Sequence, residues 1–408
     1  MNVLIVNAGS SSLKYQLIDT ATETVFAKGI CERIGIDGSC IEHKNLIKGT
    51  KVAEDLAMQN HAQAMQAVVA KLLDAEHGCI ASMDEIEAVG HRVVHGGAFF
   101  SESMLLTEDV LEKLKLCHDF APLHTPAHIQ GIQGCLEVMP EKPQVLVFDT
   151  AFHQSMAPEA YMYALPYEVY EQYGVRRYGA HGTSHRFVSG EMTRILGRVE
   201  GTKIVTCHIG NGSSISAVKD GKVVDTSMGF TPLAGVEMGT RCGDIDPALV
   251  PYMMEKLNLT AAEVNNLMNK KSGFLGISGF SSDSRDLETA IANGPSDPNY
   301  ERANLAVNIL KFQIKKYIGA YAAAMNGLDA IVFTAGIGEN NPHLREMVCE
   351  DMEYFGVKID KELNAKTLRQ SNIVKLSTDD SKVAVYLIPT NEELVIARDT
   401  EALVNAKA

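Results

Sequence analysis

The sequence lacks the features that mark several common protein classes. It has no run of about 18 apolar residues, the length that a membrane-spanning helix needs. Its eight cysteines are scattered, without a C-x-x-C pair or the spacing of a zinc site, which favours reduced thiols and a cytoplasmic location. Residues 1–6 have neither the basic region nor the cleavage site of a secretory signal peptide, so we expect none.

An excess of positive charge is also missing. The formal net charge is −14, so no basic field offsets a nucleic-acid backbone, which argues against a general nucleic-acid binder. Hydrophobic residues make up 46% of the chain and charged residues 22%, as in ordinary globular proteins. A chain of 408 residues is longer than one core usually supports, so two domains are expected.

The stretch from Lys203 to Val218 carries the most distinctive pattern. Residues 204–207 predict a short buried strand, and residues 215–218 predict another. Between them, His208-Ile-Gly-Asn-Gly-Ser-Ser214 supplies glycines, an asparagine and hydroxyls, a composition that lets backbone N–H groups face a phosphate. Because this loop joins two strands, it is neither a GxxxxGK[ST] P-loop nor a GxGxxG dinucleotide turn.

The N-terminus repeats this arrangement. Residues 2–28 read as a strand, a loop of small residues (Ala8-Gly-Ser-Ser-Ser12), a strand, a turn and a third strand. The same order occurs at 203–227, which indicates two similar halves rather than a short solenoid repeat. For this pair of segments alone, two unrelated hairpins with Gly and Ser turns are the alternative.

Two arginines are surrounded by glycine. Arg92 lies in Gly90-His-Arg-Val-Val-His-Gly-Gly97, and Arg241 lies in Gly239-Thr-Arg-Cys-Gly243. In a net-acidic protein, two such arginines suggest a clamp on a phosphate or a carboxylate. Two unrelated ion pairs in loops are the alternative explanation.

A histidine and an aspartate occupy positions typical of anion chemistry. His181 stands among small residues just before a helix predicted at about 184–196, and a helix N-terminus attracts anions. Asp149 ends the apolar strand predicted at 144–148, and open α/β sheets keep their chemistry at the carboxyl ends of strands. A structural cap of a helix or turn is the alternative role for Asp149.

Two segments near the C-terminus also predict binding functions. Residues 329–334 read as a strand that enters Gly336-Ile-Gly-Glu-Asn340, a loop whose N–H groups suit a nucleoside or α-phosphate. Thr390, with Glu393 three residues later, predicts a capping box at the start of the last helix. That box does not use Glu392, which is therefore the better candidate for a metal ligand.

Apolar spacing predicts the main helices, and histidine spacing raises one alternative site. Helices are expected over 50–78, 107–118, 248–257, 261–270 and 300–325. Histidines stand four apart at 91/95, 124/128 and 181/185, which on a helix would place both members of a pair on one face, as in a zinc site. No HExxH motif and no cysteine partner accompanies a pair, which argues against zinc.

Taken in order, these motifs resemble those of the acetate kinase family, the acetokinases, within the acetate and sugar kinase/Hsc70/actin superfamily. The resemblance runs nearly end to end, and no single motif decides it. The motifs are Asn7-Ala-Gly-Ser-Ser-Ser-Leu-Lys14, Gly90-His-Arg-Val-Val-His-Gly-Gly97, Phe148-Asp-Thr-Ala-Phe-His153, Tyr178-Gly-Ala-His-Gly-Thr-Ser-His185, His208-Ile-Gly-Asn-Gly212, Gly239-Thr-Arg-Cys-Gly-Asp-Ile-Asp-Pro247, Asp283-Ser-Arg285, Gly336-Ile-Gly-Glu-Asn340 and Pro389-Thr-Asn-Glu-Glu393.

The resemblance implies an α/β fold of two duplicated actin-like (ribonuclease H-like) domains, each a mixed sheet flanked by helices, with the active site in the cleft between them. The N-terminal domain would comprise residues 1–149 and 386–408, and the nucleotide-binding domain residues 150–385. The implied reaction is the reversible conversion of ATP and acetate to ADP and acetyl phosphate, a step toward acetyl-CoA. It would use Mg²⁺, or Mn²⁺ in its place, in a cytoplasmic homodimer without nucleic-acid or membrane partners.

Position by position, the resemblance assigns a role to each motif residue. Arg92, Asp149, His181 and Arg241 would be catalytic, with His181 and Arg241 stabilising the transferring phosphoryl group and Arg92 binding the carboxylate. Asn7 and Glu392 would hold the metal ion. ATP would be bound by Lys14, His208, Ile209, Gly210, Asn211, Gly212, Asp283, Ser284, Arg285, Gly336, Ile337, Gly338, Glu339 and Asn340. Because acetate is already ionised at neutral pH, Asp149 is expected to position the metal or the nucleophile rather than remove a proton.

The resemblance also implies an acyl pocket lined by Val94, Leu123, residue 180 and Pro232. Residue 180 is Ala here, where some family members carry Phe. A smaller side chain would admit a longer acyl chain, and one methylene is worth only about 1–3 kcal/mol, so propionate is expected as a secondary substrate.

Two alternatives stay open on the sequence. One is a kinase of the same family that prefers propionate or butyrate. The other belongs to a different class: a non-catalytic, actin- or Hsp70-like ATP-binding switch or filament subunit. Such a protein would need the ATP loops but not Arg92, Arg241 and His181 together, so the presence of all three favours the kinase.

Overall fold

The structure is a computed structural model that describes residues 1–122 and 124–407, and the chain forms two compact units. Unit 1 comprises Met1–Phe152 and Asn391–Ala408, and unit 2 comprises His153–Thr390. Both crossings lie slightly later in the chain than the expected boundaries at 149/150 and 385/386. At the second crossing the reason is that residues 386 and 387 belong to a strand of the unit 2 sheet.

Unit 1 is built on an eight-stranded mixed sheet with the strand order β5-β4-β3-β2-β1-β6-β8-β7. Strands β1 to β5 form an antiparallel meander, and β6 and β8 lie parallel to β1. The strands are β1 (Asn2–Gly9), β2 (Ser12–Asp19), β3 (Thr24–Glu32), β4 (Cys40–Asn45), β5 (Thr50–Asp55), β6 (Ala88–Val93), β7 (Met104–Leu105) and β8 (Gln144–Phe148). The helices are α1 (His61–Leu72), α2 (Glu108–Leu116), α3 (Thr125–Val138) and α15 (Glu392–Lys407).

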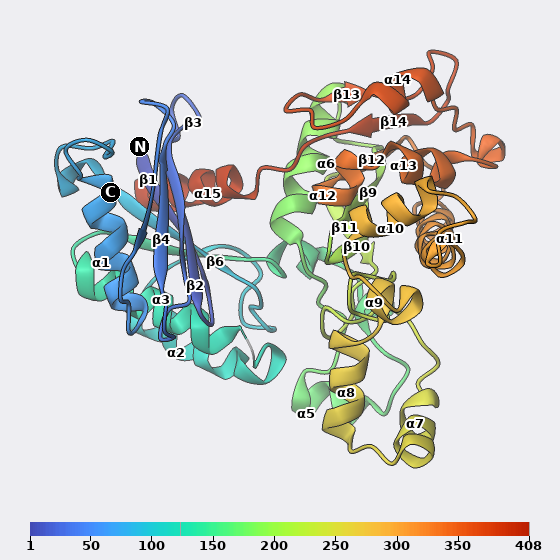
Figure 1. Ribbon diagram of the computed structural model, residues 1–408, viewed down its shortest axis with the longest axis horizontal. Helices are drawn as coiled ribbons and strands as arrows, with labels where there is room; N and C mark the ends of the chain where they lie inside the picture. The colour runs from blue at the N-terminus through green and yellow to red at the C-terminus, as the bar shows by residue number, and fades with distance from the viewer. Residues whose placement is uncertain (123, 408) are drawn as a thin grey trace. The chain divides into compact units, whose positions relative to one another are not determined.

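Both faces of β1 are covered, which explains why the strand is apolar along almost its whole length. Leu4 and Val6 belong to a core cluster shared with α1 and α3. Val3 and Ile5 point to the opposite face, where they pack with Ile396 of α15. Figure 1 shows α15, in red, beside the blue strands of this unit. The C-terminal helix therefore belongs to the N-terminal sheet, as the sequence predicts.

Unit 2 repeats the topology around a six-stranded sheet with the order β11-β10-β9-β12-β14-β13. The strands are β9 (Lys203–Ile209), β10 (Ser213–Lys219), β11 (Lys222–Thr226), β12 (Ala330–Thr334), β13 (Val374–Lys375) and β14 (Ala384–Leu387). The helices are α4 (Pro158–Tyr161), α5 (Tyr167–Tyr173), α6 (Gly182–Leu196), α7 (Leu249–Leu257), α8 (Ala261–Lys270), α9 (Gly273–Ser278), α10 (Ser284–Ala292), α11 (Tyr300–Met325), α12 (Ala335–Asn340), α13 (Pro342–Cys349) and α14 (Lys361–Lys366).

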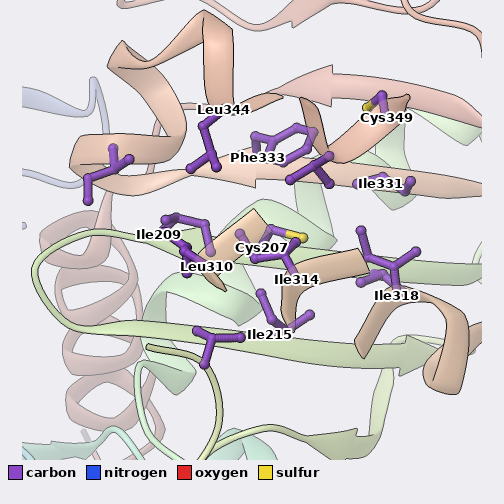
Figure 2. Packing of buried hydrophobic residues seen from close by; sticks show 14 of the residues in the cluster. Cys207, Ile209, Ile215, Leu310, Ile314, Ile318, Ile331, Phe333, Leu344 and Cys349 are labelled. Atoms are coloured by element: carbon purple, nitrogen blue, oxygen red, sulfur yellow. The ribbon is translucent and has the colours of Figure 1, made fainter. Parts of the chain in front are cut away.

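The duplication predicted from the sequence is confirmed by the two strand orders. In each unit a three-stranded antiparallel meander is followed by two parallel strands, so that β1, β6 and β8 correspond to β9, β12 and β14. The mixed α/β class is likewise confirmed. Figure 2 shows the core of unit 2, where Cys207 and Ile209 of β9 and Phe333 of β12 pack against Ile314 and Leu310 of the long helix α11.

Two local predictions were wrong. The helix expected over residues 50–78 is only α1, which begins after the side-chain cap Asn60, while residues 50–55 pair with β4 as the edge strand β5. Residues 336–340, which were expected to form a loop, belong to the short helix α12. Asn341 separates α12 from α13 and caps the N-terminus of α13. Within the described residues, no helix combines the length and the apolar character that crossing a membrane requires.

Candidate active site

In unit 1, Arg92 and Asp149 meet at the carboxyl ends of two neighbouring parallel strands. Arg92 lies near the end of β6, and Asp149 directly follows β8, whose Val147 is paired with Arg92 in register. The guanidinium donates from Nε and Nη2 to one carboxylate oxygen of Asp149, at 3.1 and 2.8 Å. The Asp149 carboxylate raises the pKa of Arg92 above its ordinary value, so the arginine is a fixed cation.

Glu392, the first residue of α15, adds a second carboxylate to this pair. Its Oε2 lies 3.6 Å from Nη2 of Arg92. Burial, together with the negative charge of Asp149, raises the pKa of Glu392 to about 7, although Arg92 opposes the shift. One arginine thus serves two carboxylates, and the group carries one negative charge more than it can neutralise when both are ionised.

The local chemistry of Glu392 fits the metal ion expected there. A hard cation such as Mg²⁺ prefers oxygen ligands and usually retains several waters and substrate phosphates, so it needs few protein ligands. Glu392 and the amide of Asn7 supply such oxygens, and two carboxylates beside the single Arg92 leave an excess of negative charge that a cation would neutralise. No set of three His, Cys, Asp or Glu side chains suited to a metal occurs in residues 1–122 and 124–407, so a zinc centre has no ligand set there.

Asn7 and Lys14 face each other across β1 and β2 and line a cavity of about 230 Å³ in unit 1. Glu393 and two further lysines, Lys28 and Lys44, also line it. Lys44 is paired with Glu42, whereas no acidic side chain of the described residues forms an ion pair with Lys28. The sequence analysis missed Lys28, because only the register of β2, β3 and β4 places it on the same face as Lys14.

The capping box predicted for Thr390 and Glu393 was wrong. The residue that caps α15 is Asn391, whose Oδ1 accepts the N–H of Leu394 at 3.1 Å. Thr390 instead donates its hydroxyl to Ser184 in unit 2. Glu393 has no capping role and lines the cavity of Asn7 and Lys14, so the argument that set it aside as a metal ligand no longer holds.

In unit 2, His181 and Arg241 meet at the loop between β9 and β10. His181 is the residue before α6, in a left-handed conformation with φ of 59°, and its ring stacks on that of His208 at a centroid distance of 4.1 Å. A side chain added at Gly212 would lie 3.4 Å from Nη2 of Arg241 and 3.5 Å from Nε2 of His181. The phosphate-type loop, the histidine and the arginine predicted from the sequence are therefore brought together.

Arg241 has no carboxylate partner among the described residues of the chain. Its Nη1 donates to the carbonyl of Pro232 at 2.8 Å and lies 3.4 Å from the sulfur of Met238. Burial lowers the pKa of Arg241, with no acidic side chain to reverse the shift. Even a part-buried guanidinium without a counter-ion is costly, and an anionic ligand would relieve that cost.

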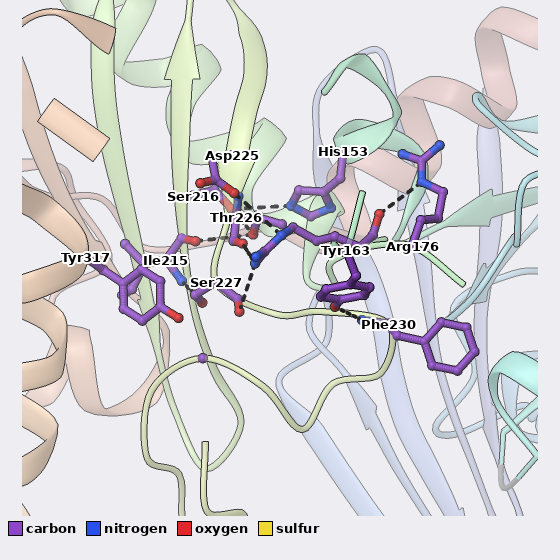
Figure 3. Close-up of polar contacts among 12 residues, drawn as sticks. His153, Tyr163, Arg176, Ile215, Ser216, Asp225, Thr226, Ser227, Phe230 and Tyr317 are labelled. Carbon is purple, nitrogen blue, oxygen red and sulfur yellow. Dashed lines mark hydrogen bonds and ion pairs between the residues drawn. The ribbon is translucent and has the colours of Figure 1, made fainter. Parts of the chain in front are cut away.

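The loop that follows β11 and leads to Pro232 is anchored by polar contacts (Figure 3). The hydroxyl of Tyr163 accepts the N–H of Phe230 at 2.8 Å. Arg177 donates to the carbonyl of Thr226, and Asp225 lies 3.7 Å from its Nε. These contacts hold the backbone that supplies the acceptor for Arg241.

The remaining nucleotide segments of unit 2 also converge. A side chain at Gly210 would reach Ala335 and Gly336, at 3.8 and 3.9 Å. The side-chain amide of Asn211 occupies the space over Gly239, where a Cβ would overlap its Oδ1 at 1.7 Å. Gly239 is therefore required by close packing. Segments 208–212, 239–241 and 335–336 form one surface, which the sequence could only suggest as separate motifs.

Residues 283–285 make local contacts at the start of α10, and their role in binding ATP stays a prediction. Asp283 caps α10 by accepting the N–H of Arg285 at 2.9 Å, and it also pairs with the guanidinium of Arg285, whose side chain is 85% exposed. Ser284 is the first residue of α10. On the next segment, Glu339 turns its carboxylate back to the N–H of Ala335 at 2.9 Å, so this side chain of the 336–340 group is engaged within the protein.

The expected acyl-pocket residues are described only in part. Leu123 lies outside the described residues. The N–H of Val94 donates to Nε2 of His128 at 3.2 Å, and burial lowers the pKa of that histidine to about 4, so it is a neutral acceptor. Ala180 is buried with Met228 and Met238 in a small apolar cluster. The role of Ala180 in acyl selection stays a prediction.

Comparisons with known proteins place this arrangement in one family. The profile of the acetokinase family matches residues 2–398. The chain belongs to the acetokinase family. It is 56% identical to the acetate kinase of Fusobacterium nucleatum, over 98% of this chain and 99% of the relative. It is 54% identical to the acetate kinase of Methanosarcina barkeri, over 100% of this chain and 98% of the relative.

Solved acetokinase structures share the fold over the full length. The crystal structure of Porphyromonas gingivalis acetate kinase matches with a TM-score of 0.94 and 47% identity, covering 99% of each chain. A propionate kinase from Francisella tularensis matches with a TM-score of 0.89 and 40% identity, over 98% of this chain and 99% of that one. The predicted duplicated actin-like fold is therefore confirmed.

Proposed function

We propose that this protein is a reversible phosphotransferase that moves the γ-phosphoryl group of ATP to the carboxylate of acetate, forming acetyl phosphate and ADP. The single observation that carries the proposal is the part-buried Arg241 without a carboxylate partner among the described residues, set beside His181 at the loop of residues 208–212. Family membership over nearly the whole chain supports the same reaction. A nucleotide switch without catalysis would have no use for such an unpaired cation.

The chemical difficulty of this reaction is electrostatic. The acetate carboxylate is already a nucleophile at neutral pH, so no general base is needed. One of its oxygens forms a bond to the γ-phosphorus as the bond from phosphorus to the β–γ bridging oxygen breaks, ADP leaves, and no proton is transferred. Both reactants are anions, and positioned cations are what lower the barrier to such a transfer.

Each site residue has a role in that scheme. Arg241 and His181 would donate to the equatorial oxygens of the phosphoryl group as it passes between two oxygens. Arg92 would bind the acetate carboxylate, held in orientation by Asp149, which keeps the guanidinium fixed. Asp149 is a positioning group in this account. Mg²⁺, held by Asn7 and Glu392, would neutralise phosphate charge when bound.

A preference for propionate is the second candidate within the family. The observation in its favour is the small side chain at Ala180, and a propionate kinase is among the similar structures. Because one methylene changes binding by only about 1–3 kcal/mol, we expect propionate to be used more slowly than acetate and not to be excluded.

We also propose a homodimer in the cytoplasm. Two exposed apolar side chains on α11, Leu305 and Phe312, support the homodimer.

A hydroxamate-trapping assay tests the proposed function. Purified protein is incubated with ATP, Mg²⁺ and hydroxylamine, together with acetate, propionate or butyrate in separate reactions, and the acyl hydroxamate is measured. We expect rapid ATP-dependent product with acetate, less with propionate and least with butyrate. ATP binding without any hydroxamate would support the non-catalytic switch, and a rate that is highest with propionate or butyrate would reassign the substrate.

A further inference from the structure

Thr390, the last residue of unit 2, is held by two segments of the nucleotide site. Its hydroxyl donates to Oγ of Ser184 at 2.8 Å, and its N–H donates to Oε1 of Glu339 at 3.2 Å. Ser184 lies in the first turn of α6, and Glu339 lies in α12. Nothing in the family motif explains this, because the sequence suggested only a helix cap for Thr390.

The contact with Glu339 supports a strained backbone. Ala335 begins α12 with φ of 65°, a left-handed conformation that a residue with a Cβ adopts only at a cost. The Glu339 carboxylate accepts the Ala335 N–H at 2.9 Å and also lies 3.3 Å from the hydroxyl of Thr334. The Thr390 N–H is thus one of three donors that keep this carboxylate in place at the turn into residues 336–340.

The contact with Ser184 has a direction, and this direction leaves the Ser184 hydrogen available to His208. A serine hydroxyl has a single hydrogen to donate. Ser184 receives a hydrogen bond from Thr390, and its oxygen also lies 2.7 Å from Nδ1 of His208. With the Thr390 hydrogen already pointing at Ser184, the Ser184 hydrogen is free to point at Nδ1. A neutral His208 then carries its proton on Nε2.

That tautomer matters because His208 opens the phosphate-type loop. Its ring stacks on that of His181 at 4.1 Å, and Nε2 of His181 lies beside Gly212, as Nη2 of Arg241 does. An Nε2–H group is a hydrogen-bond donor, which suits a phosphate oxygen, whereas a bare Nε2 would repel it. The hydrogen bonds from Thr390 to Ser184 and from Ser184 to His208 therefore favour the tautomer of His208 that can donate to an anion.

We propose that Thr390 is a positioning residue that acts through Ser184 to hold His208 in its Nε2-protonated tautomer and through Glu339 to hold the start of α12. The expected change in the KM for ATP rests on the proposed function, whereas the expected change in the His208 tautomer does not. The hydrogen bond to Ser184 comes from the hydroxyl of Thr390, whereas the contact with Glu339 comes from its backbone N–H. Valine has the same shape as threonine, so Thr390→Val removes the bond to Ser184 and leaves the contact with Glu339 in place.

The test uses the full-length protein with ¹⁵N-labelled histidine. Imidazole ¹⁵N shifts distinguish the two tautomers, and a His208→Gln variant identifies the resonances of His208. Wild type and Thr390→Ser, which keeps the hydroxyl, should show His208 protonated on Nε2. Thr390→Val should lose that single tautomer, and its KM for ATP should rise about three- to tenfold, as expected for one lost hydrogen bond, with a smaller change in KM for acetate.

Two further variants keep the outcome decisive. Ser184→Ala should disturb His208 in the same way, and adding Thr390→Val to it should have no further effect on His208. Thr400→Val removes another buried threonine hydroxyl, one bonded only to the carbonyl of Ile396, and should leave the His208 shifts unchanged. An unaltered His208 tautomer in both Thr390→Val and Ser184→Ala would overturn the inference. A missing kinase activity in wild type would instead reject the proposed function, because the tautomer is read without turnover.

Discussion

Arg92 and Arg241 look alike in the sequence, yet their surroundings differ. Arg92 is paired with Asp149 at 2.8 Å and lies 3.6 Å from Glu392, so its charge is already committed within the protein. Arg241 meets only a carbonyl and a sulfur among the described residues. A paired guanidinium is well suited to orient a ligand, and an unpaired one to stabilise charge that develops during the reaction.

Glu392 and Glu393 are adjacent but have different neighbours, which makes them a matched pair for locating the metal ion. We predict that Glu392→Ala raises the Mg²⁺ concentration for half-maximal activity more than Glu393→Ala does, because Glu392 and Asp149 together carry more negative charge than Arg92 neutralises. Since a metal ligand must lose its proton, the Mg²⁺ requirement of the wild type should also rise as the pH falls below about 7. Titrations of activity against Mg²⁺ measure both effects.

The structure also shows which result would place the metal ion next to Glu393 instead of Glu392. Glu393 shares a cavity with Asn7, the other proposed ligand, so a larger effect of Glu393→Ala would move the metal ion to that cavity. A Mg²⁺ requirement that does not change between about pH 8 and pH 6 would separate Glu392 from metal binding.

At the scale of elements, the segment that carries Arg241 contains a buried acid. Glu237 is 2% exposed, and neither of its carboxylate oxygens has a hydrogen-bond partner among the residues that the structure describes. Its N–H donates to Gln313 of α11 at 2.5 Å, and the next residue, Met238, donates its N–H to the carbonyl of Arg241 at 3.1 Å. Burial raises the pKa of Glu237 to about 8, so the side chain is neutral through most of the acidic range.

This burial predicts a pH-dependent stability. A carboxyl whose pKa is higher in the folded state than in the unfolded state contributes stability below the unfolded pKa near 4.5, and loses it as the pH rises to about 8. Glu237→Gln should therefore raise the free energy of unfolding at about pH 9 by on the order of 1–3 kcal/mol and change it little at about pH 5. Denaturant unfolding measures it, with the exposed Glu255→Gln as the control. An equal effect at both pH values would contradict the burial argument.

Elements with a strong periodic pattern could be predicted from the sequence. The duplicated meander follows from β1 and β9, which are apolar because both of their faces are covered, and from the small-residue loops after them. Helices α7, α8 and α11 were likewise predicted closely. Helix starts with two neighbouring candidate cap residues could not be predicted. For α15, the cap is Asn391 rather than Thr390.

The site was predictable as residue types but not as contacts. His181, Gly212 and Arg241 could be identified one by one, because glycine, histidine and arginine suit anion chemistry at those positions. Their convergence depends on the β9–β10 register and on the packing of Asn211 over Gly239, which no local pattern encodes. Lys28 and Ser184 were missed for the same reason, since each acquires its place only through a partner distant in sequence.

At the scale of the whole molecule, the chain passes between the two units twice, after Phe152 and after Thr390. Each crossing stands next to site residues: Asp149 shortly precedes the first, and Glu392 shortly follows the second. Short stretches of sequence thus connect Asp149 and Glu392 of unit 1 to unit 2, which carries the segments proposed to bind nucleotide.

The negative net charge of the whole chain makes a few local cations important for binding anionic substrates. With a net charge of −14, the protein as a whole repels both ATP and acetate. Binding and reaction of two anions must therefore depend on local positive groups, and among the described residues the part-buried Arg241 has no acidic partner of its own. The central claim is that this guanidinium acts on the phosphoryl group in transit.

The most direct test is the rate of phosphoryl transfer by Arg241→Ala, measured together with its ATP affinity. The account predicts that kcat falls by at least about 10²-fold while the Kd for ATP changes only a few-fold, because the lost interaction belongs mainly to the transition state. Arg194→Ala, which breaks an exposed ion pair with Glu191 on α6, should behave as wild type. Turnover by Arg241→Ala close to that of wild type would contradict the account.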